Sequence, residues 1–145
     1  MSRYQRILLV IDLVADSDLI AERALAIAAR NEADIVLLHV VEYMPVEPMG
    51  EALLPSVQLE AGLVEDAEKR LAGLATRLGL DHCKRRVATG NTKAEILRAA
   101  HDLKSDLIVL GSRERHGLAI LVNLTEDTVL HAAPCDVLAV RLNRE

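Results

Sequence analysis

Short apolar runs alternate with amphipathic stretches along most of the chain. Three of the runs are almost continuous in Val, Ile and Leu, without a regular exchange of apolar and polar positions. Such runs are typical of strands buried on both faces, as parallel sheets require. With two further runs, the pattern predicts five strands: Arg6–Asp12, Asp34–Val41, Cys83–Ala88, Asp106–Leu110 and Asp136–Arg141.

The stretches between these runs carry apolar residues three or four positions apart, the spacing of one helix face. They predict helices over residues 16–31, 57–78, 92–103 and 125–131. Asp16 or Ser17 is expected to cap the first helix, and a Thr92-x-x-Glu95 capping box to begin the third. The long second helix ends at Gly79, and its apolar residues recur at intervals of three or four: Leu59, Leu63, Ala67, Leu71, Leu74 and Leu78.

The alternation of strands and helices predicts right-handed crossovers and a doubly wound α/β sheet with helices on both faces. In such sheets, ligands bind outside the carboxyl ends of the strands, where the strand order reverses. Four segments are expected to meet there: 10–13, 39–42, 90–91 and 111–125. Residues 42–55 contain three prolines and a glycine, which predicts a long loop at the same edge.

The composition narrows the function. The 145 residues include no Phe or Trp and only two Tyr, and the net charge is −5. A nucleic-acid-binding protein is not expected, because a cationic footprint and aromatic platforms are both missing. The short basic run 84–86 is interpreted as a solvated strand edge. Cys83 and Cys135 belong to no C-x-x-C motif and are expected to be buried free thiols.

Several kinds of site and location are not expected. No secretory signal and no apolar run of about 20 residues is visible, which predicts a soluble, cytoplasmic protein without membrane contact. The histidines and cysteines have no zinc spacing, so no metal site is predicted. Ser112 and His116 have no evident third group to orient them, so no catalytic residue is predicted. His39 is expected to be a hydrogen-bonded strand histidine and not a ligand.

Four segments together resemble the universal stress protein family of the UspA type: RILLVID with its acidic turn, LLHVVE, TGNTKAEIL and DLIVLGSRERHGL…VLHAAPCDVLAVR. The resemblance covers essentially the whole chain. It implies one domain over 1–145, a Rossmann-like (adenine nucleotide alpha hydrolase-like) three-layer sandwich, and five parallel strands in the order 3-2-1-4-5. It also implies a cytoplasmic homodimer that pairs through the last strand, at Val137, Leu138, Ala139 and Val140. An apolar edge strand has to be covered, which agrees with pairing.

One branch of this family binds ATP through a loop with three glycines, the last followed by Ser or Thr. By resemblance, the first glycine matches Gly111, the second falls on Glu114 and the third on Leu124. The hydroxyl is kept as Thr125, which is also explained more simply as a helix N-cap.

The same resemblance extends to the adenosine side of the site. It places Asp12 near the adenosine and Val40 against the base, and Val10 and Ile11 belong to the same strand ends. Asp12 has a second interpretation, because a carboxylate after a strand often caps the following turn.

Loss of two glycines predicts that ATP is not bound tightly. Glu114 and Leu124 crowd the position of the triphosphate, and the acidic pair 126–127 adds repulsion. Arg113 and Arg115 could compensate. Two functions stay open: a non-enzymatic stress-response protein without cofactor that binds unidentified proteins, or a switch that binds ATP or AMP with Mg²⁺ and hydrolyses ATP very slowly. A redox or small-acid-binding enzyme has only fold analogy behind it.

Overall fold

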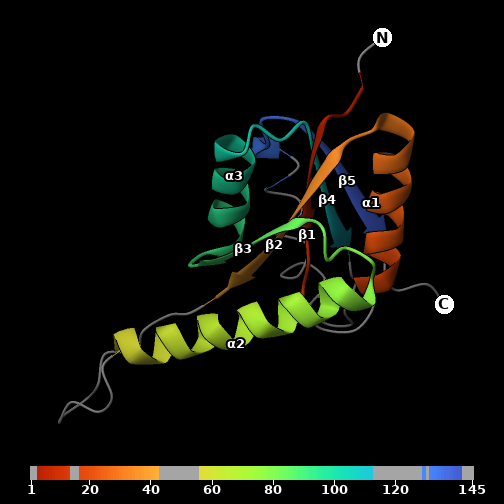
Figure 1. Cartoon of the computed structure of the whole chain (residues 1–145). Helices are drawn as coiled ribbons and strands as arrows, with labels where there is room; N and C mark the ends of the chain where they lie inside the picture. Colours follow the sequence, from red (N-terminus) through yellow and green to blue (C-terminus); the bar gives the residue numbers. More distant parts are fainter. Residues whose placement is uncertain (1–2, 14–16, 43–55, 113–128, 130, 142–145) are drawn as a thin grey trace.

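The computed structural model describes residues 3–13, 17–42, 56–112, 129 and 131–141 (Figure 1). For Ser112 and residues 56–58 it describes the backbone only. The elements in chain order are β1 Arg6–Val10, α1 Ser17–Asn31, β2 Asp34–Val41, α2 Ser56–Arg77, β3 Lys84–Thr89, α3 Thr92–Asp102, β4 Leu107–Ser112 and β5 Asp136–Arg141.

The five strands form one parallel sheet in the order β3-β2-β1-β4-β5, which confirms the predicted fold class. Leu8 at the centre of β1 is aligned with Val36 of β2 and with Ile108 of β4. The predicted bounds of β2 and β5 are those observed, and the other strands are shifted by one or two residues. Of the predicted last helix, 125–131, Val129 and His131 are helical, as is Ala132 just beyond it, and the rest of the predicted range lies outside the described residues.

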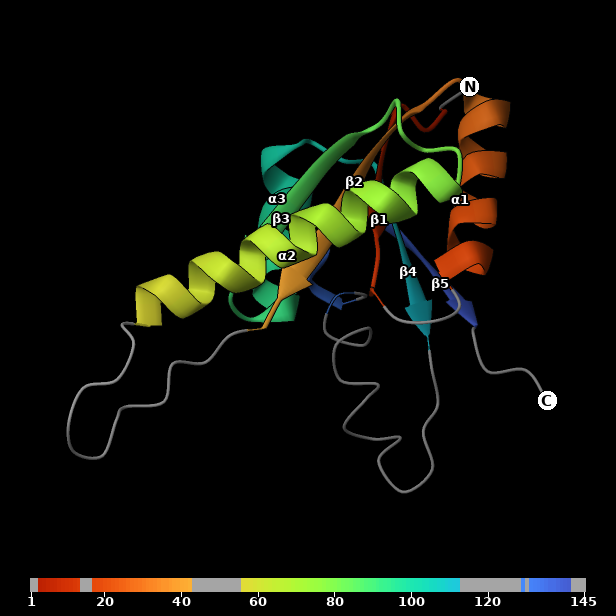
Figure 2. The same ribbon diagram turned by 60° about the horizontal axis from the view of Figure 1, so that its bottom comes forward.

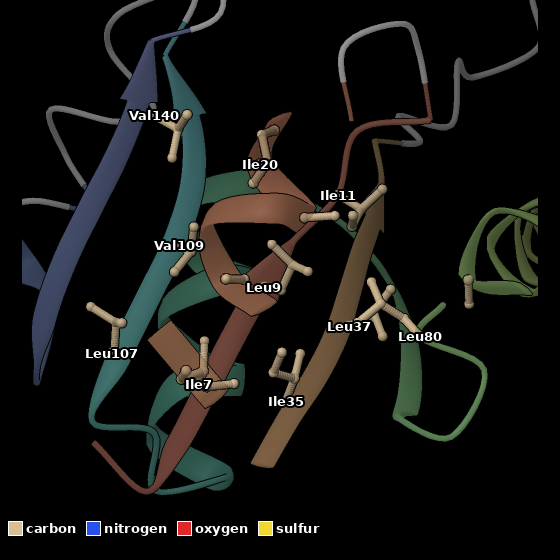
Figure 3. Close-up of a cluster of buried hydrophobic side chains, with 14 of the residues drawn as sticks. Ile7, Leu9, Ile11, Ile20, Ile35, Leu37, Leu80, Leu107, Val109 and Val140 are labelled. Atoms are coloured by element: carbon tan, nitrogen blue, oxygen red, sulfur yellow. The ribbon is translucent and has the colours of Figure 1, made fainter. Parts of the chain in front are cut away.

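Two apolar clusters lie on opposite faces of the sheet, because successive strand residues point to opposite sides. The ribbon shows α2 and α3 on opposite sides of the sheet (Figure 2). Ile7, Leu9 and Ile11 belong to the cluster with residues of α1 and α2 (Figure 3), whereas Leu8 belongs to the cluster with residues of α3. All four side chains are at most 1% exposed. Burial of each such side chain stabilises the fold by about 1.5–3 kcal/mol. The core is therefore built from aliphatic side chains and needs no Phe or Trp.

The helix α2 is buried in only one of its halves. Leu71 and Ala75 are fully buried against the sheet, whereas Leu59 is 47% and Leu63 is 44% exposed. The N-terminal part of α2 projects past the edge strand β3, where the sheet ends (Figure 1). The apolar spacing of Leu59 and Leu63 therefore does not place them in the core, because no strand lies beneath that part of the helix among the described residues.

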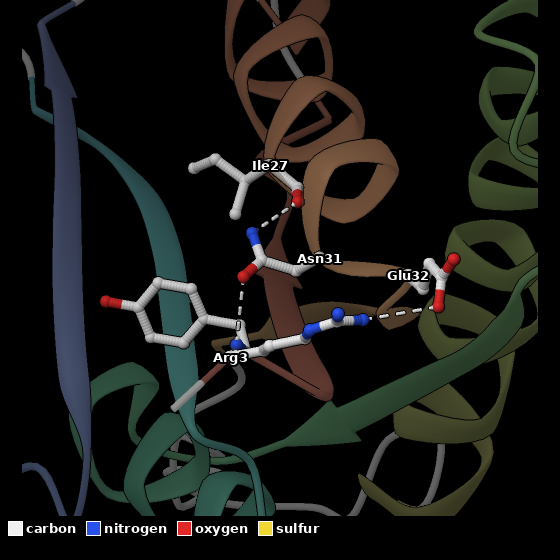
Figure 4. A network of polar contacts seen from close by, with 5 residues as sticks. Arg3, Ile27, Asn31 and Glu32 are labelled. Atoms are coloured by element: carbon white, nitrogen blue, oxygen red, sulfur yellow. Dashed lines mark hydrogen bonds and ion pairs between the residues drawn. The ribbon is translucent and has the colours of Figure 1, made fainter. Parts of the chain in front are cut away.

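Hydrogen bonds between side chains and the backbone stabilise the amino-terminal edge of the sheet. The Asp106 carboxylate accepts hydrogen bonds from the backbone N–H groups of Gln5 and Arg6, at 2.8 and 3.0 Å. The Asn31 amide accepts from the Tyr4 N–H at 3.1 Å and donates to the Ile27 carbonyl at 2.8 Å (Figure 4). These bonds satisfy backbone groups at the start of β1 and in α1, and they couple the start of β1 to α1 and to the residue before β4.

Candidate functional site

The carboxyl ends of β1 and β2 form the floor of the candidate site. The Ile11 N–H donates to the Leu38 carbonyl at 2.8 Å, so strand pairing continues one residue beyond β1. The Ile11 carbonyl lies 2.8 Å from His39 Nδ1. A carbonyl can only accept, so this contact requires the proton on Nδ1. His39 is thus a hydrogen-bonded strand residue, as predicted.

Asp12 follows Ile11 in the chain, and its backbone carbonyl and its side-chain carboxylate have different environments. Its carbonyl accepts a hydrogen bond from the buried Ser17 hydroxyl at 2.9 Å, which ties the start of α1 to the end of β1. Its side chain is exposed at the carboxyl edge. Residues 14–16, which the carboxylate would cap in the alternative interpretation, lie outside the described part of the chain, so both interpretations of Asp12 stay open.

The start of α3 supplies a second carboxylate at this edge. Glu42 follows β2, and its carboxylate accepts from the Thr92 hydroxyl at 2.5 Å and from the Thr92 N–H at 3.4 Å. Negative charge at a helix N-terminus is favourable because the free N–H groups carry partial positive charge. The chain's own side chain therefore occupies a position where an external anion could otherwise bind.

The expected capping box at Thr92 was wrong. Asn91 is the N-cap, and its side-chain oxygen accepts from the Ala94 N–H at 3.0 Å. Asn is as good a cap as Thr or better, so the sequence permitted both positions. Gly90 precedes it with a φ of 132°, a conformation that side chains rarely adopt. Sequence reasoning identified the turn at 90–91 but missed the role of Glu42.

The other predicted nucleotide-site residues divide into two groups. Val40 is only 8% exposed and packs in the cluster beneath α3, and Val10 packs against the same cluster. Gly111 lies near the end of β4, aligned with Val140 of β5. The second group, Arg113, Arg115 and Thr125, lies outside the described residues, as do Glu114 and Leu124. The described part of the edge thus brings together Val10, Ile11, Asp12, Val40 and Gly111.

A cation also reaches this edge from α2. The Arg70 guanidinium donates to the Leu13 carbonyl at 2.8 Å, so it lies beside the turn that follows β1. A guanidinium is permanently charged and can bind carboxylate or phosphate. Nothing in the local sequence pattern around position 70 indicated this contact, because 57 residues separate its partners.

The described residues hold no cluster of three or more His, Cys, Asp or Glu side chains that could bind a metal ion. Cys83 and Cys135 are free and half-buried. Burial raises the pKa of both thiols, with Asp34 and Asp81 adding to the effect at Cys83 and Asp136 and Asp106 at Cys135. A raised pKa disfavours the reactive thiolate. Both cysteines are free of disulfides, as predicted, but less buried than predicted.

The predicted dimer surface lies on the edge strand β5. Val140 is 3% exposed and belongs to the monomer core, Val137 and Leu138 are half-buried, and Ala139 is exposed. β5 pairs with β4 on one side, and no described residue forms a strand on its other side. Pairing through β5 therefore stays a prediction. No helix in the described ranges combines the length and apolar character needed to cross a membrane.

Comparison with known proteins agrees with this architecture. The family model of the universal stress protein family matches residues 3–141. Universal stress protein A homolog 2 of Coxiella burnetii is 36% identical over 143 residues, covering 98% of each chain. The structure of UspA from Lactobacillus plantarum is 25% identical, with a TM-score of 0.70 over 97% of this chain and all of that one.

A further solved structure was determined with a ligand. It is described as a universal stress protein in complex with cAMP, and it covers 98% of this chain and 100% of that one, with 22% identity and a TM-score of 0.65. Together with the match to the family model over 3–141, the sheet order and the full-length relatives show that the chain belongs to the universal stress protein family.

Proposed function

We propose that the protein is a non-enzymatic regulator of the stress response, a cytoplasmic homodimer that acts by binding other proteins. In this proposal its nucleotide loop is degenerate and does not bind ATP tightly. Family membership supports the stress-response role. The observation that carries the second part is in the sequence: by the family resemblance, Glu114 and Leu124 replace two loop glycines. The Glu42 carboxylate, which accepts hydrogen bonds from Thr92, adds negative charge at the same edge of the sheet.

Charge at the carboxyl edge supports this proposal. The exposed carboxylates of Asp12 and Glu42 lie at the ends of neighbouring strands. The sequence adds Glu114, Glu126 and Asp127 between the first loop glycine and the last helix. Like charges close together repel, and burial of a triphosphate beside them would carry an unfavourable desolvation cost.

Calorimetric titration with ATP and Mg²⁺ tests the proposal. The wild-type chain is expected to show no dissociation constant in the low micromolar range. The double substitution Glu114→Gly with Leu124→Gly restores the glycine pattern and is expected to increase ATP affinity. Low-micromolar ATP binding by the wild type would contradict the proposal. Failure of the double substitution to improve affinity would show that the glycines are not the limiting feature.

A second candidate is a switch that binds an adenosine ligand with a single phosphate, such as AMP or cAMP. The observation that favours it is the exposed Asp12 carboxylate at the end of β1, because carboxylates are suitable acceptors for ribose hydroxyls. The similar protein solved with cAMP supports the same ligand class. One phosphate brings less negative charge to this acidic edge than three do, so repulsion is smaller.

A ligand series separates the two candidates. If the switch operates, thermal-shift and calorimetric titrations should show affinity decreasing from cAMP or AMP through ADP to ATP. Asp12→Asn should weaken the best ligand, whereas Asp81→Asn should leave it unchanged because Asp81 is an exposed carboxylate just before β3, at the opposite edge. Absence of any response to all four ligands would exclude the switch and leave the protein-binding role.

A further inference from the structure

One side of α2 carries a regular row of exposed residues. Two of them also contact the same chain: Arg70 donates to the Leu13 carbonyl, and Arg77 forms an ion pair with Asp18 of α1. The row, called the outer stripe here, consists of Leu59, Leu63, Asp66, Arg70, Gly73 and Arg77, and every member is exposed. The intervals along it are four, three, four, three and four residues. Residues with this spacing lie on one side of a helix, and the same spacing forms the contact line of two paired helices.

The two ends of the outer stripe differ in shape and charge. Leu59 and Leu63 expose apolar surface at the projecting end. At the other end, Leu13, Arg70, Gly73, Leu74 and Arg77 line a hollow of about 350 Å³. Gly73 leaves this surface open, because a Cβ built there would have no atom within 4 Å. The same helix therefore exposes apolar side chains at one end and borders a hollow with apolar and basic lining residues at the other.

The two halves of α2 also differ in charge. Residues 56–68 contain four acidic side chains and no Lys or Arg, whereas residues 69–77 contain three basic side chains and no Asp or Glu. Two copies of α2 would attract each other if they ran antiparallel, because each acidic half would then face a basic half. In a parallel arrangement, like charges would face each other, which is unfavourable.

The outer stripe is also symmetric in sequence position. Its members lie nine, five and two residues on either side of position 68. A two-fold axis near position 68 would therefore align Leu63 with Gly73 of a second copy, and Asp66 with Arg70. It would also align Leu59 with Arg77, whose long aliphatic part can cover an apolar side chain while its charge stays in water. A two-fold contact requires this kind of self-complementary surface.

We propose that the outer stripe of α2 is a docking surface for a second copy of this chain, with the two helices antiparallel. Leu63 of each copy fills the hollow at Gly73 of the other. Contacts between Asp66 of one copy and Arg70 of the other replace the 3.9 Å pair within each helix and select the antiparallel orientation. The paired segment from 59 to 77 is about 27 Å long at 1.5 Å per residue. Two leucines per copy give a small interface, so the contact belongs to the weak, reversible class.

This surface is separate from the edge strand β5, on which the proposed homodimer depends. If both contacts form, β5 joins two copies and α2 joins the resulting pairs. If β5 does not pair, α2 alone gives a dimer. Substitutions on the outer stripe distinguish the two contacts, because none of its members lies in or beside β5.

Sedimentation velocity of the full-length chain, at concentrations up to about 1 mM, tests the docking surface. Leu59→Gln with Leu63→Gln should weaken self-association about tenfold or more, since apolar contact is lost in both copies. Ala61→Gln is the matched control: the residue is exposed on α2 but lies outside the stripe, and its substitution should leave association unchanged. Wild-type association that is insensitive to the leucine substitutions, or no concentration-dependent association, would overturn the proposal.

Two further variants separate docking from folding. Gly73→Gln should favour the helix in the single copy, yet it should weaken association because it fills the hollow. Asp66→Arg should also weaken association, and Asp66→Arg combined with Arg70→Asp should restore it by exchanging the charges. Asp81→Arg reverses an exposed carboxylate outside α2 and serves as control, which should leave association unchanged. No loss in Asp66→Arg, or no recovery in the exchanged pair, would refute the antiparallel alignment.

Discussion

The two halves of α2 have similar apolar spacing and opposite surroundings. Leu71 and Ala75 in the second half are fully buried beneath the helix, whereas Leu59 and Leu63 in the first half are nearly half exposed. The difference arises because β3 is the last strand on that side and only the second half of α2 lies over the sheet (Figure 1). Apolar periodicity thus indicates that a helix has an apolar side, but it does not say what covers that side.

The largest expected contrast comes from shortening one leucine in each half. Leu71→Ala should lower the free energy of unfolding by about 2–5 kcal/mol, because it removes packed methyl groups and leaves a cavity. Leu63→Ala should change it by less than about 0.5 kcal/mol in dilute solution. Urea unfolding at low protein concentration measures both values. Similar losses would mean that the first half is covered within one copy of the chain.

Replacing an alanine by a larger residue in each half of α2 tests the same difference in burial, by adding atoms instead of removing them. Ala75→Leu should destabilise by about 1–3 kcal/mol, because the core around this fully buried residue has no room for a larger side chain. Ala61→Leu adds the same atoms at an exposed position and should be close to neutral. Thermal unfolding of both variants is the measurement, and a neutral Ala75→Leu would reveal unfilled space beneath α2.

The two glycines of α2 provide a contrast, because substitution in either half should change the stability by the same amount. Gly62 and Gly73 both have no atom within 4 Å of an added Cβ. Gly62→Ala and Gly73→Ala should each stabilise the dilute protein by about 0.5–1 kcal/mol through helix propensity. Chemical unfolding of the two variants measures this. A stabilisation at only one position would indicate a neighbour that contacts the other.

The smallest effects are expected for the ion pairs. Asp18 Oδ1 lies 2.9 Å from Arg77 Nη1 and links α1 to the second half of α2. Asp18→Asn should cost about 0.2–1 kcal/mol, because both side chains are more than half exposed. Asp66→Asn removes the 3.9 Å contact with Arg70 within α2 and should cost less. Unfolding in low salt and in about 1 M salt provides the check, since screening should abolish both effects.

Strand prediction succeeded because each buried strand is a local run of Val, Ile and Leu. β2 and β5 have their predicted bounds, and the sheet order agrees with the one implied by the family resemblance. Cap positions were less certain, because neighbouring residues such as Asn91 and Thr92 can both cap a helix. The contacts of Glu42 with Thr92 and of Arg70 with Leu13 join residues 50 and 57 positions apart, so no local pattern could reveal them.

The amino-acid order was sufficient to establish the strands, their alternation with helices and the apolar side of each helix, whereas the loss of two loop glycines is what the family resemblance implies. These features depend on neighbours within a few positions along the chain, where steric and apolar periodicity act. Only the folded arrangement decided that Val40 is core, that Glu42 lies at the start of α3 and that half of α2 has no sheet beneath it. Each of these depends on which distant segments share an edge or a face, a choice made by the packing of the whole sheet.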